Sequence, residues 1–164
     1  MVQAPTRATA PSLFFSCIRE GHWTCPRRLL SSFLEDRRRS EMLKLLLDEH
    51  ISPMVADGLR RRNRQLVVFC MTEWEDGEFL GQQDRACLKQ AAAQGLTLVT
   101  CDRRTIPPLL KTWGEEGRKH GGVIFVDEKT ISPSDNGGLI RGLSSLSRKT
   151  SRWDWTNRVC FLRR

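Results

Sequence analysis

The chain of 164 residues contains no uninterrupted apolar run that approaches the length of a membrane-spanning helix. It has six cysteines but no Cys-x-x-Cys pair, and none of them stands at zinc-finger spacing from one of its three histidines. These absences argue against a membrane span, a disulfide framework and a zinc finger. We therefore expect a cytoplasmic protein with reduced cysteines, because Cys70, Cys87 and Cys101 lie inside apolar segments.

A glycine-rich turn is also missing after the first apolar segment, residues 43–47, which runs directly into Asp48-Glu49-His50. Rossmann and P-loop nucleotide-binding sites need such a turn so that the backbone can approach phosphate groups. A response-regulator receiver domain would need a Lys-Pro step after its last strand. Here Lys129 precedes Thr130, and Pro133 comes later. Both of these interpretations are therefore less favoured.

Acidic residues are in deficit, with 19 Asp and Glu against 27 Lys and Arg, which gives a formal net charge of +8. Such a surplus favours a polyanionic partner, most simply nucleic acid, although it can also serve solubility alone. Four arginines close one predicted helix: Arg60, Arg61, Arg62 and Arg64. They would contact phosphates without regard to sequence, or else they form a solvated helix end.

Two parts of the chain differ in composition. Residues 1–41 contain an Ala-, Pro- and Thr-rich start and the basic run at 37–39. We expect this extension to be poorly ordered, dispensable, or upstream of a true start at Met42, with an organellar transit peptide as the alternative. Residues 42–164 form the predicted domain.

Within that domain, apolar segments of strand length alternate with helical segments. Strands are predicted at 43–47, 66–70, 96–101, 123–126 and 158–162. Helices are predicted from Ser52-Pro53, from Asp84 to a stop at Gly95, at 106–113 and at 133–146. This alternation predicts an α/β domain with a mainly parallel central sheet flanked by helices.

Two of the predicted strands end in carboxylates, at Asp48 and at Asp102. In a parallel sheet both would emerge at the carboxyl edge, where ligands bind, and clustered carboxylates favour a hard divalent cation such as Mg²⁺. Each acid also has a local explanation. Asp48 could cap a turn, Asp84 could be a helix N-cap, and Asp102 could form an Asx-turn.

Several neighbours of these acids are weaker candidates. Glu49 could point away from Asp48, because adjacent side chains diverge. Asp127 and Glu128 follow the fourth strand and could supply a further acid. Thr100 and Arg103 flank the site and could contact a phosphate, whereas His50 is better explained as a solvent-facing turn residue.

The segments Leu45-Leu46-Leu47-Asp48-Glu49-His50-Ile51-Ser52-Pro53, Gln83-Asp84-Arg85 and Leu98-Val99-Thr100-Cys101-Asp102-Arg103 resemble a known family. It comprises small PIN-like proteins catalogued as a domain of unknown function and grouped with the toxin-type PIN ribonucleases. The resemblance covers roughly residues 43–126, and more loosely the chain to residue 162. It differs at His50, where the family often has Asn, and it does not identify a fourth acid of the fuller pattern.

The resemblance implies a PIN-like fold with an acidic pocket for Mg²⁺ or Mn²⁺ at Asp48, Glu49, Asp84 and Asp102. We therefore predict a metal-dependent ribonuclease, the toxin half of a toxin–antitoxin pair, in which Asp48, Asp84 and Asp102 are catalytic. Its partners would be RNA, bound through the four helix arginines and Arg103, an antitoxin protein, and a second copy in a homodimer. The alternative is a catalytically silent PIN-like module that binds RNA or protein, and metal binding separates the two.

Overall fold

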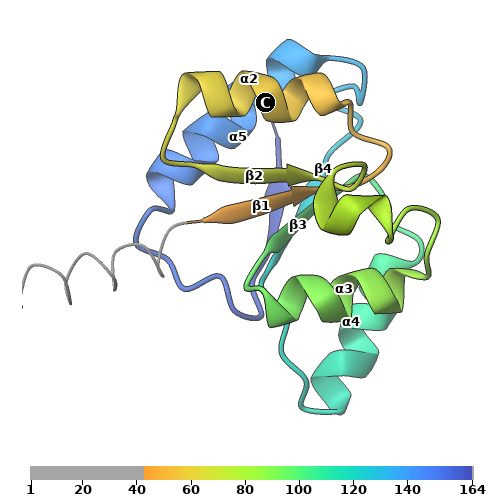
Figure 1. Ribbon diagram of the computed structural model, residues 1–164. Helices are drawn as coiled ribbons and strands as arrows, with labels where there is room; N and C mark the ends of the chain where they lie inside the picture. The colour runs from red at the N-terminus through yellow and green to blue at the C-terminus, as the bar shows by residue number, and fades with distance from the viewer. Residues whose placement is uncertain (1–42, 164) are drawn as a thin grey trace, which may run out of the picture.

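A five-stranded sheet forms the centre of the structure, a computed structural model that describes residues 43–163 (Figure 1). Its strand order is β2-β1-β3-β4-β5, and every pairing is parallel. The strands are β1 (Lys44–Leu47), β2 (Val67–Cys70), β3 (Thr97–Thr100), β4 (Val123–Val126) and β5 (Val159–Leu162). Between them lie the helices α2 (Pro53–Arg62), α3 (Asp84–Ala93), α4 (Ile106–Glu115) and α5 (Asn136–Lys149), and the short 3₁₀ helix η1 (Trp74–Gly77). The predicted α/β class is confirmed, and the arrangement is consistent with a PIN-like fold.

The helix starts show which local signals work. The Ser52 hydroxyl accepts the Met54 amide at 3.3 Å, so Ser52 caps α2 and Pro53 opens it, as predicted. Asp84 is the first helical residue of α3 and not its N-cap, because Gln83 holds the cap position. The last helix begins at residue 136 and not at 133, because the Asp135 carboxylate accepts the Gly138 amide at 2.8 Å.

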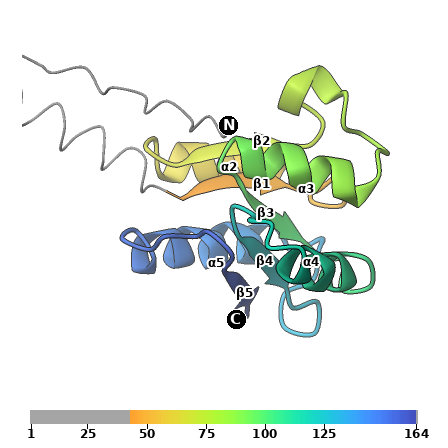
Figure 2. The ribbon, with the colours of Figure 1, turned by 90° about the horizontal axis from the view of Figure 1, so that it is seen from below.

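Helices cover both faces of the sheet, and each face has its own apolar core (Figure 2). Leu45 and Leu47 face α2 and α5, whereas Leu46 faces α3. All three leucines are fully buried. A strand that is buried on both faces has no polar side, which is why β1 reads as a continuous apolar run.

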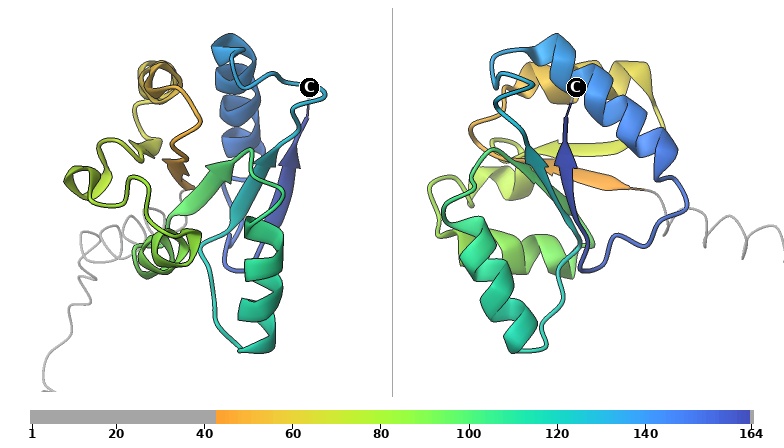
Figure 3. Two further views of the ribbon diagram at one scale, coloured as in Figure 1. Left: turned by 90° about the vertical axis from the view of Figure 1, so that its right-hand side faces the viewer. Right: turned by 180° about the vertical axis from the view of Figure 1, so that it is seen from behind.

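The connection from β4 to β5 has an unusual hand. The first three crossovers are right-handed: α2 covers one face as the chain steps from β1 to β2, and α3 and α4 cover the other as it steps towards β3 and β4. The chain then steps outwards again to β5, but α5 packs beside α2, so this crossover is left-handed (Figure 3). The α3/α4 face of β5 is therefore left without a helix, and Val159 and Phe161 are 46% and 48% exposed there.

Two further predictions concern the N-terminal extension and the lack of a membrane-spanning helix. The predicted extension, residues 1–41, lies outside the described residues. Within residues 43–163, none of the helices combines the length and the apolar character that crossing a membrane requires.

Candidate functional site

The chain reverses its direction across the sheet between β1 and β3. From β1 it passes to β2 on one side, and β3 pairs with β1 on the other, so the two adjacent strands form a topological switch point. In open α/β sheets the carboxyl ends of strands at such a point border a crevice that binds ligands. The predicted parallel pairing of the two acid-terminated segments is confirmed, and Asp48 leaves β1 with its amide bonded to the Val99 carbonyl at 3.0 Å.

A buried threonine links the first and last of the predicted acids. The Thr100 hydroxyl donates to Asp48 Oδ2 at 2.5 Å and accepts the Asp102 amide at 2.9 Å. Thr100 is 0% exposed, so no water competes for this hydroxyl. Asp48 and the start of the Asp102 turn are thereby held on one group at the end of β3.

A second threonine lies between Asp84 and Asp102. The Thr105 hydroxyl contacts Asp84 Oδ2 and Asp102 Oδ2. A hydroxyl carries one hydrogen, so it can donate to only one of two ionised carboxylates, and the other contact brings two acceptors together. A proton or a cation shared between the carboxylates would remove this mismatch. Asp84 therefore turns towards Asp102 instead of capping its own helix.

Asp102 also forms the Asx-turn that its position suggested. Its Oδ1 accepts the amides of Arg104 at 2.6 Å and Thr105 at 3.0 Å. This turn fixes the loop that leads into α4. The local role and the contact with the other acids coexist, because the two oxygens of the carboxylate point in different directions.

A pocket opens beside these groups on the α3/α4 face of the sheet. Three of its wall residues are acidic, and most of the others are apolar: Asp48, Glu49, Asp84, Gln82, Met71, Phe79, Cys87, Leu98 and Ile106. Glu49 accepts the Gly81 amide at 3.3 Å beside the pocket that it lines. Its carboxylate therefore shares the pocket with Asp48 and does not point away from it.

The pKa values of Asp48 and Asp102 are shifted in opposite directions from the ordinary value of an aspartate. Burial raises the pKa of Asp48, and this outweighs the hydrogen bonds from Thr100 and Glu49. Burial also acts to raise the pKa of Asp102, but hydrogen bonds from the Thr105 hydroxyl and the Arg104 and Thr105 amides hold it below its usual value. At neutral pH a nearby cation would therefore stabilise the ionised form of Asp48, which burial disfavours.

These shifts predict a pH dependence of stability for the metal-free protein. Because the pKa of Asp48 is raised above its ordinary value of 3.8, its contribution is fully present below that pH and is lost as the pH rises through the folded-state value. Asp102 behaves oppositely: its contribution is present above 3.8 and is lost as the pH falls through its lowered value. From about pH 4 to pH 7, the wild type should therefore lose free energy of unfolding relative to Asp48→Asn.

Urea unfolding of both proteins in EDTA at the two pH values measures this difference. The asparagine side chain in Asp48→Asn can accept only one of the two hydrogen bonds that Asp48 accepts. This loss changes the difference in free energy of unfolding by the same amount at both pH values. A wild type that gains stability relative to Asp48→Asn as the pH rises would contradict the assigned direction.

The other candidate residues near the carboxyl edge have different surroundings. His50 is a solvent-facing turn residue, 70% exposed, with Nδ1 3.9 Å from Asp48 Oδ2. Asp127 pairs with Arg103 at 3.2 Å and with Arg163 at 3.5 Å, and Glu128 is exposed. Within residues 43–163 Asp127 has no hydrogen bond to the other aspartates, and its charge is balanced by the guanidinium groups of Arg103 and Arg163.

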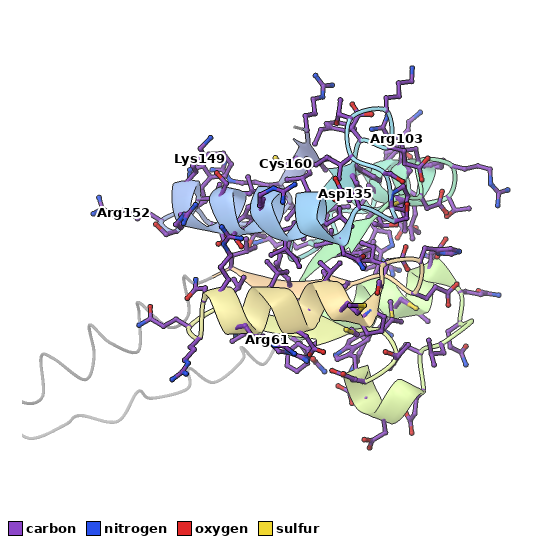
Figure 4. The ribbon with its side chains drawn as sticks, turned by 90° about the horizontal axis from the view of Figure 1, so that it is seen from above. Arg61, Arg103, Asp135, Lys149, Arg152 and Cys160 are labelled. Carbon is purple, nitrogen blue, oxygen red and sulfur yellow. The ribbon has the colours of Figure 1, made fainter. Side chains whose placement is uncertain are left out.

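The arginines of α2 do not reach the pocket. α2 starts at the carboxyl edge and runs back along β1 for about 15 Å, so its last turn lies away from that edge. Arg60 is engaged there: it donates to the Val68 carbonyl, at 2.8 Å from Nη2, and to Glu73 at 2.8 Å. These contacts tie the end of α2 to β2 and to the loop after it. Arg61 points outwards beside α2 (Figure 4), and Arg62 and Arg64 are exposed as well.

The structure adds residues that sequence reasoning missed. Thr105 was not a candidate, because a threonine three residues after an aspartate is unremarkable until α3 brings Asp84 to it. Arg104 is exposed, and its positive charge helps to lower the pKa of Asp102. The sequence feature that could have pointed to Arg104 is its position directly after Arg103.

The donor chemistry of the pocket suits a hard cation, but its groups do not form a complete cage. Asp48, Glu49 and Asp84 on the pocket wall, and Asp102 beside it, supply carboxylate oxygens, which Mg²⁺ and Mn²⁺ prefer. In the part of the chain that the structure describes, no group of three or more His, Cys, Asp or Glu side chains is spaced to hold a metal ion. Any metal site here needs side-chain rotations that bring the carboxylates closer together.

Comparison with known proteins adds no relative, since no protein-family model, curated protein or solved structure matches the chain. The PIN-like family remains an expectation from the three sequence segments.

Proposed function

We propose that this protein is a divalent-metal-dependent endoribonuclease whose reaction takes place at the carboxyl ends of β1 and β3. One observation carries the proposal: Asp48, Asp84 and Asp102 come from three separate segments and are linked near the switch point by two threonine hydroxyls. Thr100 joins the Asp48 carboxylate to the Asp102 backbone amide, and Thr105 contacts the carboxylates of Asp84 and Asp102. Local capping roles would not require Asp84 and Asp102 to share one hydroxyl. Clustered carboxylates favour a cation between them.

The residues of this site would bind metal, orient the aspartates or contact the phosphate. Asp48, Asp84 and Asp102 would hold one or two Mg²⁺ or Mn²⁺ ions, with Glu49 at the pocket mouth as a further oxygen donor. Such a metal supplies an activated water and positive charge opposite the scissile phosphate. Thr100 and Thr105 would orient the three aspartates, and the exposed Arg104 would contact the phosphate next to them.

A second candidate function has its own support. The carboxylates as described do not converge on one point, and Asp127 is already neutralised by arginines. Both observations favour a catalytically silent PIN-like module that binds RNA or protein. The toxin role, the antitoxin partner and the homodimer rest on the family resemblance.

Metal addition and removal tests the proposal on the wild-type protein. Calorimetric titration with Mn²⁺ should show saturable binding, and single-stranded RNA should be cut with Mn²⁺ or Mg²⁺ but stay intact in EDTA. Bound metal should also raise the melting temperature, because it binds the folded state alone. A protein that neither binds Mn²⁺ nor cuts RNA would leave the silent module as the function.

A further inference from the structure

An exposed aromatic ring lies on the uncovered face of β5. Phe161 is 48% exposed, and its ring stacks on that of Phe125, with centroids 5.5 Å apart and planes inclined by 27°. Phe125 is buried in the core beneath α4, so it gives the exposed ring a rigid support. The left-handed β4–β5 connection creates this face, because it places α5 on the opposite side of the sheet.

Two arginines accompany this ring. The guanidinium carbon of Arg103 lies 5.4 Å from the Phe161 centroid, and that of Arg163 lies 5.9 Å from it. Both pair with the single carboxylate of Asp127, which leaves one positive charge in excess. Their side chains are 44% and 67% exposed, so both can exchange a carboxylate contact for a phosphate.

This cluster is continuous with the candidate site. Arg103 follows Asp102 directly and reaches across the end of β4 to the Val126 carbonyl at 3.5 Å and to Phe161 on β5. The loop at 102–105 thus has the carboxylate cluster on one side and the aromatic-basic cluster on the other. A polynucleotide that crosses this loop would contact both.

We infer that Phe161, Arg103 and Arg163 form a binding subsite for single-stranded RNA, in which one base stacks on Phe161 and the arginines contact the adjacent phosphates. Stacking on an aromatic ring between guanidinium groups suits an unpaired base, whose face is open, and not a duplex, whose base faces are covered. A second copy fits this surface less well, because a chain with net charge +8 would set its own arginines against each other. The inference rests on the proposed function and deepens it by assigning the residues that would hold the single strand beside the carboxylate cluster.

Fluorescence anisotropy with a labelled single-stranded oligouridylate tests this, using the full chain in EDTA so that no cleavage intervenes. Phe161→Ala should weaken binding by at least about fivefold, and Phe161→Trp should retain it. Arg163→Ala should weaken binding more than Arg152→Ala. The second variant removes the same charge beyond the end of α5 that lies away from Arg103 (Figure 4). Melting curves for each variant show that it is folded, and a duplex RNA of equal length should compete poorly.

The outcomes separate the two proposals. Equal affinity for the wild type and Phe161→Ala would overturn the subsite, whether or not the protein cuts RNA. A wild-type dimer in sedimentation that Phe161→Ala converts to monomers would also overturn it, and would make this face an interface between copies. Phe161-dependent binding without Mn²⁺-dependent cleavage would uphold the subsite and refute the nuclease.

Discussion

Asp48→Asn should abolish Mn²⁺ binding and lower RNA cleavage by at least about 100-fold, while the protein remains folded. Asp48 is a half-buried carboxylate at the switch point, and burial raises its pKa, so a cation beside it would stabilise its ionised form. Asparagine keeps the shape and one hydrogen bond but removes the charge that a divalent ion requires. Titration calorimetry and a gel-based cleavage assay measure the two losses.

Asp57→Asn provides a matched control. Asp57 carries the same charge on α2, with its side chain 54% exposed and paired with Arg60 at 3.3 Å. Its replacement should leave metal affinity and cleavage at wild-type levels. An Asp48→Asn protein that cuts RNA as fast as the wild type would show that the activity arises elsewhere or from a contaminant.

Leu46→Ala and Leu47→Ala should each lower the free energy of unfolding by about 2–5 kcal/mol. The two side chains point to opposite faces of β1, and both are fully buried, Leu46 against α3 and Leu47 against α2 and α5. Each substitution opens a cavity in a different core. Since small domains have roughly 5–15 kcal/mol of stability in all, the double variant should be largely unfolded.

Leu80→Ala makes the same chemical change where the side chain is 44% exposed, so its effect should be well under about 1 kcal/mol. Urea denaturation of the three variants measures the differences. A small effect at Leu46 beside a large one at Leu47 would contradict the burial of β1 on both faces.

Local patterns predicted the elements well. Ser52-Pro53 marked the start of α2, Gly95 followed the end of α3, and the non-alternating apolar runs at 43–47 and 123–126 marked the buried strands β1 and β4. These signals work because capping, backbone conformation and two-sided burial act on residues that are close in the sequence. The start of α5 was predicted three residues early, because both Pro133 and Asp135 are reasonable starts and only the Asp135 contact chooses between them.

The site was predictable in part. Parallel strands that end in Asp48 and Asp102 had to meet at one edge, and their adjacency in the sheet places them on the two sides of Thr100. Which arginines are engaged was not predictable. Arg60 and Arg103 find their partners, Glu73 and Asp127, only after the chain has folded.

The sequence alone therefore determined the α/β class, the order of the elements and the edge at which the acids emerge, because these follow from local pattern and from the parallel arrangement of strands. Tertiary structure decided the rest. Thr105 joins Asp84 to Asp102 because α3 and the loop before α4 pack side by side, across 21 residues of sequence. The placement of α5, which leaves Phe161 uncovered, likewise depends on its packing against α2, a contact between residues far apart in the chain.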